Sequence, residues 1–281
     1  MSQNNEEIKN QQQAVWNKFS GGWKKWDNEN NSFTGKASKG IIDSFQLKED
    51  AYILDIASGT GEPGLSLAVK VPKGKVVLTD IAEDMLAVAK ELSEKKGITN
   101  IEIIAAPSDK VPFPNESFDA LSCRFGFMFF PDIKATLDEC YRVMKPNATI
   151  TTAVWAAPDK NQFATIIMGI ISKYVEMPAP NPDAPGFFRC AKPGYLSGLF
   201  SGAGFKNVTE KEQPLFFESD SIDVYWKFMT ELAAPIVMGM SKADDETKEK
   251  IKKEVYEQMQ KYMTEGHLAV PACAIIISGQ K

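Results

Sequence analysis

The feature that most constrains the fold is an alternation of strand and helix patterns between residues 51 and 155. Short apolar segments predict five strands, at residues 51–57, 75–79, 101–106, 118–123 and 149–155. Three segments between them have helical spacing, at residues 62–71, 83–96 and 133–144. Repeated alternation of this kind predicts a parallel sheet with helices on both faces. The nearly continuous apolar runs are typical of strands buried on both sides.

The alternation breaks after residue 155. Further helices are expected at residues 162–177, 194–203, 221–238 and 244–263, and further strands at residues 208–217 and 270–278. Four prolines within residues 178–185 predict an extended connector. We therefore expect a doubly wound α/β sheet of seven strands, six parallel and the last antiparallel, with a helical cap. The expected units are a helical lid segment (1–40), a cofactor-binding core (41–155), a cap with one returning strand (156–265) and the final strand (266–281).

The N-terminal segment is rich in aromatic residues. Trp16, Phe19 and Trp23 are spaced by three and four residues, so they share one face if the segment is helical. Residues 1–12 are expected to fray, and residues 27–38 form a polar stretch. The aromatic residues either pack the N-terminal helix or form a lid over a flat, apolar ligand. On the second interpretation, Trp23 and Trp26 bind substrate.

Composition excludes several classes of protein. The 281 residues are 43% apolar and carry a net charge of −5, so neither a disordered chain nor a mainly nucleic-acid-binding protein is expected. The start of the chain is polar, and no apolar run reaches the ~18 residues of a membrane-spanning helix. The four cysteines form no C-x-x-C pair and no zinc-like cluster with histidine, so no metal is expected. We expect a reduced, cytoplasmic protein. An apolar stripe in residues 244–263 belongs either to the core or to the face of a homodimer.

The most informative local pattern lies between the first predicted strand and helix. Gly59, Gly61 and Gly64 satisfy the spacing G-x-G-x-x-G, which alone is a weak signal and also fits a tight turn without a ligand. Asp80 follows Gly61 by 19 residues and ends the second predicted strand. In doubly wound folds an acidic side chain at this position meets ribose hydroxyl groups.

Dinucleotides and S-adenosylmethionine both fit this arrangement, and the local chemistry favours the second. A pyrophosphate needs free N–H groups and no negative charge at the start of the helix. Here Glu62 would repel a phosphate, Pro63 lacks an N–H group, and no Lys or Arg occurs between Asp55 and Val69. The sulfonium and ammonium groups of S-adenosylmethionine suit an acidic cleft lined by backbone.

Four segments carry a resemblance to a known family. The first two, ILDIASGTGEPGLSLA and VVLTDIAEDMLAVAKE, are similar to the first motifs of class I S-adenosylmethionine-dependent methyltransferases. The later segments, VPFPNESFDALSCRFGFMFFPD and ECYRVMKPNATI, resemble the ubiquinone/menaquinone-biosynthesis methyltransferase-like group. The resemblance runs from about residue 51 to residue 155. It implies a Rossmann-like fold, S-adenosylmethionine as cofactor, S-adenosylhomocysteine as product and a small-molecule methyl acceptor.

The resemblance also implies cofactor contacts at the matching positions. Asp55 would hold the ammonium group through water, and Asp80 the ribose hydroxyls. Backbone groups of Ala57, Gly59 and Gly61 would face the methionine part. The remaining implied contacts concern the adenine edge and the methyl-transfer site, at Ile81, Met85, Ser108, Asp109, Arg124 and Phe125.

One departure from the family pattern and three open candidate residues remain. Pro107 stands where the group usually has an acidic residue, so Asp109 or backbone must replace that adenine contact. Arg189 either clamps an acidic acceptor or lies on the surface. His267, the only histidine, is a candidate general base, although a solvated loop histidine is the ordinary alternative. Arg124 is a second candidate catalytic residue.

The acceptor itself is expected to be a small molecule with a hydrophobic or aromatic part. Transfer to carbon, oxygen, nitrogen or sulfur remains open. Two other classes of function also remain open: a non-catalytic cofactor-binding or interaction protein, and an NAD(P)-dependent oxidoreductase.

Overall fold

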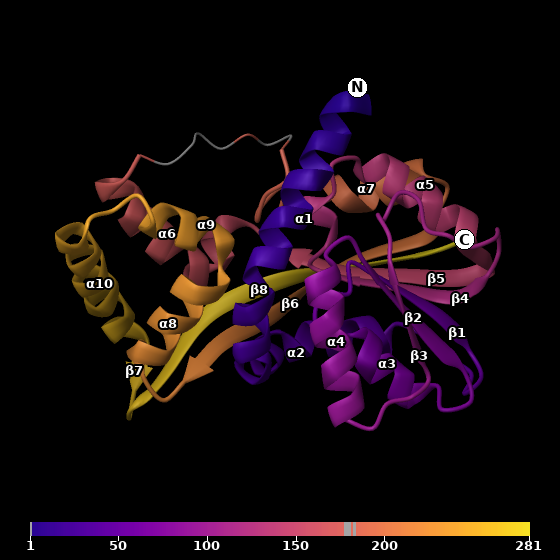
Figure 1. Ribbon diagram of the computed structural model, residues 1–281, viewed down its shortest axis with the longest axis horizontal. Helices are drawn as coiled ribbons and strands as arrows, with labels where there is room; N and C mark the ends of the chain where they lie inside the picture. The colour runs from indigo at the N-terminus through magenta and orange to yellow at the C-terminus, as the bar shows by residue number, and fades with distance from the viewer. Residues whose placement is uncertain (1, 177–180, 182–183) are drawn as a thin grey trace.

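The computed structural model describes residues 2–176, 181 and 184–281 (Figure 1). Within these residues the strands form one sheet in the order β3-β2-β1-β4-β5-β8-β6, with the short β7 paired to β8. Their bounds are β1 (Tyr52–Ile56), β2 (Lys75–Asp80), β3 (Ile101–Ala105), β4 (Phe118–Arg124), β5 (Met144–Trp155), β6 (Lys206–Ser219), β7 (Met263–Thr264) and β8 (His267–Gln280).

The pairing confirms the predicted sheet. Strands β1 to β5 pair in parallel, and β8 runs antiparallel between β5 and β6. Six long strands therefore share one direction and the last is reversed. The two-residue strand β7, which closes a hairpin with β8, was not predicted.

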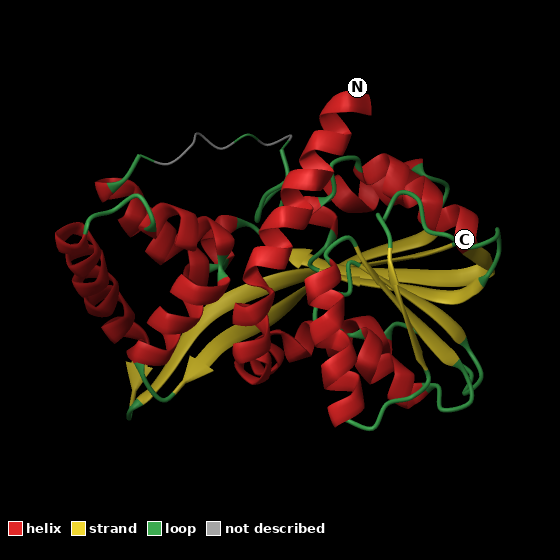
Figure 2. Cartoon of the chain, viewed as in Figure 1, coloured by secondary structure: helices red, strands yellow, loops and turns green. Residues whose placement is uncertain are grey.

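Helices cover both faces of the sheet (Figures 1 and 2). One face carries α2 (Asp27–Asp43), α3 (Gly64–Lys70) and α4 (Glu83–Lys95), and the other carries α5 (Ile133–Val143) and α7 (Tyr195–Gly202). The strand cores between them are almost fully buried, as the continuous apolar runs predicted.

Strands β6 and β8 extend beyond the rest of the sheet as a long antiparallel arm. Each has 14 residues, and their pairing continues to Ser219 and Leu268, past the end of β5. Four helices gather around this arm: α6 (Gln162–Tyr174), α8 (Ile222–Leu232), α9 (Ala234–Met240) and α10 (Asp245–Met259) (Figure 1). The single helix expected at residues 221–238 is interrupted at Ala233, because Pro235 begins a new helix there.

The N-terminal segment differs from expectation in two ways. Residues expected to fray belong to α1 (Ser2–Lys25), and the polar stretch forms most of α2. The buried face of α2 has helical spacing but includes polar residues, at Asn30, Phe33, Thr34, Ala37, Ser38 and Ile41. The polar residues interrupt the apolar helical period by which α2 would have been recognised in the sequence. They are buried because the residues that pack against them come from distant segments of the chain.

Other expectations have different outcomes. The predicted stripe in α10 is core, since Ile251, Val255 and Met259 are buried within the chain. A homodimer stays a prediction. Most of the predicted proline-rich connector, residues 178–180, 182 and 183, lies outside the described residues. In the part of the chain that the structure describes, no helix is long and apolar enough to cross a membrane.

Candidate functional site

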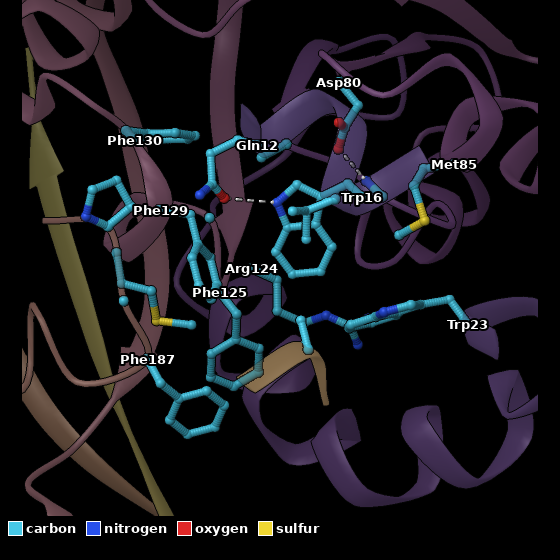
Figure 3. A pocket seen from close by; sticks show the side chains of 18 of the residues that line it. Gln12, Trp16, Trp23, Asp80, Met85, Arg124, Phe125, Phe129, Phe130 and Phe187 are labelled. Atoms are coloured by element: carbon cyan, nitrogen blue, oxygen red, sulfur yellow. Dashed lines mark hydrogen bonds between the residues drawn. The ribbon is translucent and has the colours of Figure 1, made fainter. Parts of the chain in front are cut away.

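A cavity of about 480 Å³ opens at the carboxyl ends of the parallel strands. It lies next to the boundary between β1 and β4, where the strand order reverses and ligands usually bind in open α/β sheets. Segments after β1, β2, β3, β4 and β5 line it, together with α1, α2, α6, α8 and α9. Figure 3 shows side chains as far apart in the sequence as Gln12 and Phe187 converging on this space.

The glycine-containing loop forms one wall. Ala57 and Gly59 line the cavity, and both have positive φ, 50° and 54°. Gly61 does not line it. A Cβ atom at Gly61 would lie 2.8 Å from Leu65, so this glycine permits close packing onto α3. The loop therefore presents backbone at two of the three positions expected to face a ligand.

Asp80 fixes this loop from the end of β2. Its carboxylate accepts hydrogen bonds from the Gly59 and Ala82 N–H groups, each at 2.9 Å (Figure 3). Its side chain lines the cavity although the residue is 8% exposed. Burial raises the pKa of Asp80, against the lowering effect of these N–H groups.

Asp55 lies behind the loop and not on the cavity wall. Its carboxyl accepts hydrogen bonds from the Ser122 hydroxyl at 2.5 Å and from the Gly64 N–H at 3.2 Å. Burial raises the pKa of Asp55 to about 7. Asp55 thus occupies the N-terminus of α3 from within, the position where a dinucleotide's pyrophosphate would have to bind.

The remaining predicted cofactor residues lie together. Ile81, Met85, Ser108 and Asp109 all line the cavity, as does Pro107. The Ile81 carbonyl accepts a hydrogen bond from Gln13 of α1 at 2.9 Å, and Ser108 is hydrogen-bonded to Thr136 at 3.1 Å.

Asp109 lies on the cavity wall beside Pro107 and has one carboxylate oxygen without a partner in the described chain. Its Oδ2 atom pairs with Lys9 of α1 at 2.8 Å, while its buried Oδ1 atom has no hydrogen-bond partner among the described residues. Burial lowers the pKa of Lys9, but its pairs with Asp109 and Glu6 outweigh that effect and raise it overall. A free carboxylate oxygen at this edge suits an amino N–H group.

The opposite half of the cavity is aromatic. Phe125 stacks on Trp155 with ring centroids 4.2 Å apart and an interplanar angle of 14°, and Phe187 stacks on Trp155 at 5.2 Å and 10°. Phe125 has a positive φ of 58°, which turns its side chain back onto the end of β5. Further apolar residues complete this wall, namely Phe33, Phe163, Phe228, Met229, Leu232 and Ile236.

The two tryptophans predicted to bind substrate have different positions. Trp23 lines the cavity, and its buried Nε1 atom has no partner among the described residues. The structure places Trp26 away from the cavity wall. Its ring packs against Phe228 and its Nε1 atom donates to Glu231 of α8 at 2.9 Å, so it ties the junction of α1 and α2 to the cap.

The structure does not bring the expected clamp and base residues to the cavity wall. Arg189 does not line the cavity, and its guanidinium donates to the backbone carbonyls of Phe130 and Pro131. His267 begins β8 at the tip of the arm, where its side chain is 52% exposed and lies near Glu218 and Asp220. Arg124, the other candidate, does line the cavity and is anchored to α2.

Several lining residues carried no recognisable sequence signal. Gln12, Asn30 and Phe33 belong to α1 and α2, whose helical periods were the available clue. In the described part of the chain, no group of three or more His, Cys, Asp or Glu side chains has the arrangement of a metal site.

This geometry matches S-adenosylmethionine better than a dinucleotide. The helix terminus that a pyrophosphate would need is taken by Asp55, and the wall offers backbone, Asp80 and the free oxygen of Asp109. A doubly wound sheet with this loop and this acidic residue is the arrangement of a class I S-adenosylmethionine-dependent methyltransferase.

Comparison with known proteins gives the family. The model of the ubiE/COQ5 methyltransferase family matches residues 8–172, and the chain belongs to this family. A demethylmenaquinone methyltransferase of Thermus thermophilus is 36% identical over 125 residues, 44% of this chain and 56% of that protein. Its counterpart in Listeria monocytogenes is 26% identical over 189 residues, 62% of this chain and 77% of that protein.

A solved structure supports the fold. The YcgJ protein of Bacillus subtilis is 19% identical, with a TM-score of 0.58, and the match covers 88% of this chain and 98% of that one.

Proposed function

We propose that this enzyme transfers a methyl group from S-adenosylmethionine to a reduced quinone-type ring with an apolar substituent. The observation that carries the proposal is that the glycine loop and the stacked aromatic wall belong to one continuous cavity. The relatives named as demethylmenaquinone methyltransferases support the choice of ring.

The proposed cofactor contacts follow from the wall described above. Asp80 accepts hydrogen bonds from the ribose hydroxyls, Met85 and Ile81 flank the adenine, and Asp109 accepts from its amino group. Ser108 lies beside that edge, Ala57 and Gly59 face the methionine part, and Asp55 and Gly61 support the loop from behind. When bound, S-adenosylmethionine supplies a methyl group on a sulfonium sulfur. A nucleophilic atom of the acceptor would attack the methyl carbon in line, and the sulfur would leave as the thioether of S-adenosylhomocysteine.

The aromatic half positions the acceptor. The parallel planes of Phe125, Trp155 and Phe187 favour a flat ring by offset stacking. Residues 156–265 act as the cap, because α6, α8 and α9 contribute apolar side chains that exclude water from this half. Holding the two reacting atoms together is worth roughly 7–11 kcal/mol of the barrier in favourable cases.

The carboxylates on the wall favour carbon as the methylated atom. Each already has a partner: Glu62 pairs with Lys96, Asp80 accepts backbone N–H groups, Asp109 pairs with Lys9, and Asp132 caps α5. The Asp109 Oδ1 atom, which has no partner in the part of the chain that the structure describes, is assigned to the adenine edge, so none of these carboxylates is left as a general base for the acceptor. A hydroquinone ring carbon is nucleophilic before it loses its proton, so carbon–carbon bond formation requires little help from a protein base.

The test is a methyl-transfer assay with short-chain demethylmenaquinol kept reduced by dithionite. We expect a product heavier by one CH₂ unit, formed together with S-adenosylhomocysteine, and no product from the oxidised quinone. Asp80→Ala serves as the inactive control. Binding of S-adenosylhomocysteine without methylation of the quinol would contradict the proposed acceptor and leave the cofactor assignment intact.

A further inference from the structure

Three hydrogen-bond donors on the cavity wall have no use in the functions assigned above. They belong to Trp23 of α1, Asn30 of α2 and Arg124 at the end of β4. The Trp23 Nε1 atom is buried without a partner, and the Asn30 side chain makes no hydrogen bond to another described residue although the residue is 4% exposed. Figure 3 shows the Arg124 side chain extending toward the Trp23 ring.

Arg124 is anchored through only one of its nitrogen atoms. Its Nη1 atom donates to Ser38 Oγ at 2.9 Å, Thr34 Oγ1 at 3.0 Å and, more weakly, Asn31 Oδ1 at 3.4 Å. These three acceptors lie along one side of α2. The Nε and Nη2 atoms donate no hydrogen bond to any residue of the described chain, so one edge of the guanidinium is left for a ligand.

The charge of this guanidinium is not neutralised by a direct ion pair within the described residues. Burial lowers the pKa of Arg124, while Glu62, Asp55 and Asp27 favour its charged form from a longer distance. An arginine in a protein nevertheless remains charged. A partly buried charge without a counter-ion is costly, and so is the buried Trp23 N–H group without an acceptor. An anionic ligand would relieve both costs.

We propose that Trp23, Asn30 and Arg124 form an anion site that binds a negatively charged oxygen of a ligand in this cavity. The planar guanidinium edge matches a carboxylate or an ionised ring hydroxyl, and the indole N–H and carboxamide add donors beside it. The inference also explains why the buried side of α2 carries polar residues: they hold Arg124 in place.

Two ligands of this cavity carry such an oxygen, and the inference rests on the proposed function for both. One is the carboxylate of the cofactor's methionine part, and the other is an ionised hydroxyl of the quinol. The two sources can be separated, because 5′-methylthioadenosine has the adenosine and thioether of the cofactor but no carboxylate.

The experiment uses Arg124→Gln and Trp23→Phe, with Arg142→Gln as the matched control. Arg142 lies on α5, pairs with Glu139 and does not line the cavity. Calorimetry measures binding of S-adenosylhomocysteine and of 5′-methylthioadenosine, and initial rates with the quinol give its KM. Trp23→Phe keeps an aromatic side chain and removes the indole N–H group together with its five-membered ring, so it provides a second test if Arg124→Gln loosens α2 and lowers the melting temperature.

If the site holds the cofactor carboxylate, Arg124→Gln weakens S-adenosylhomocysteine binding about tenfold or more and leaves 5′-methylthioadenosine unchanged. If it holds the acceptor, both nucleosides bind as in the wild type and the quinol KM rises by a similar factor. In either case Trp23→Phe gives a smaller change in the same ligand, and Arg142→Gln gives none.

Wild-type binding and KM values in both variants would overturn the inference and leave the proposed function standing. Equal weakening of both nucleosides would overturn it as well, because the effect would then not depend on the carboxylate. A wild-type protein that binds no S-adenosylhomocysteine would contradict the proposed function, and this inference with it.

Discussion

The two ends of the cavity are built in different ways. The cofactor end comes mainly from residues 55–109, where backbone groups of short turns meet Asp80 and Asp109. The aromatic end gathers single side chains from five distant places, Phe33, Phe125, Trp155, Phe187 and Phe228. A site made by consecutive backbone follows from local spacing, whereas a site made by scattered side chains exists only after the chain has folded.

The largest expected effect concerns the buried carboxyl beneath the cofactor end. The pKa of Asp55 is about 7 in the folded chain against 3.8 as its ordinary value. Between these values the unfolded chain has released a proton that the folded chain retains, so stability falls as pH rises, by on the order of a few kcal/mol in total. Asp55→Asn should remove this loss.

Urea unfolding at pH 5 and pH 8 measures this loss of stability. The free energy of unfolding of the wild type should fall between these values more steeply than that of Asp55→Asn. Asp84→Asn, at an exposed position on α4, should behave as the wild type. Identical pH dependence in all three proteins would show that the folded cofactor end does not hold this proton.

The next largest effect tests whether the cofactor end binds the cofactor without help from the aromatic end. Asp80→Ala removes a carboxylate that accepts two N–H groups and faces the cavity. Loss of ligand hydrogen bonds to a charged group, each worth about 1.5–3 kcal/mol, should weaken S-adenosylhomocysteine binding roughly a hundredfold by calorimetry. Asp84→Ala is the control. If the dissociation constant of S-adenosylhomocysteine changes less than about threefold in Asp80→Ala, the prediction is contradicted. The aromatic end would then contribute much of the affinity for the cofactor.

The smallest effect tests the aromatic end. Phe187→Leu removes one stacked ring while keeping an apolar side chain. Since an aromatic pair adds about 0.5–1.5 kcal/mol beyond area burial, the quinol KM should rise roughly three- to tenfold. S-adenosylhomocysteine binding should stay constant. Phe216→Leu, on the exposed side of β6, should alter neither quantity. Weaker cofactor binding in Phe187→Leu would mean that the two ends are not separable.

The sheet could be predicted from the sequence because strand–helix alternation and buried apolar runs are local signals. The position of Asp80 followed from its distance to the glycine loop, whereas Met85 was implied only by the family resemblance. The helix α2 could not be recognised, because Asn30, Thr34 and Ser38 look like surface residues until Arg124 and the cavity are present. The sequence could not show that Trp26 and Arg189 have protein partners, Glu231 and two backbone carbonyls, which lie far away in the chain.

The helix α1 spans both ends of the cavity. It pairs with Asp109 through Lys9 and with Ile81 through Gln13, and its C-terminal end reaches Glu231 of the cap through Lys25. A helix of 24 residues behaves as a stiff rod of roughly 36 Å, so it cannot lift from one ligand while staying seated on the other. A displacement of α1 that opened one end of the cavity would therefore also disturb its contacts at the other end.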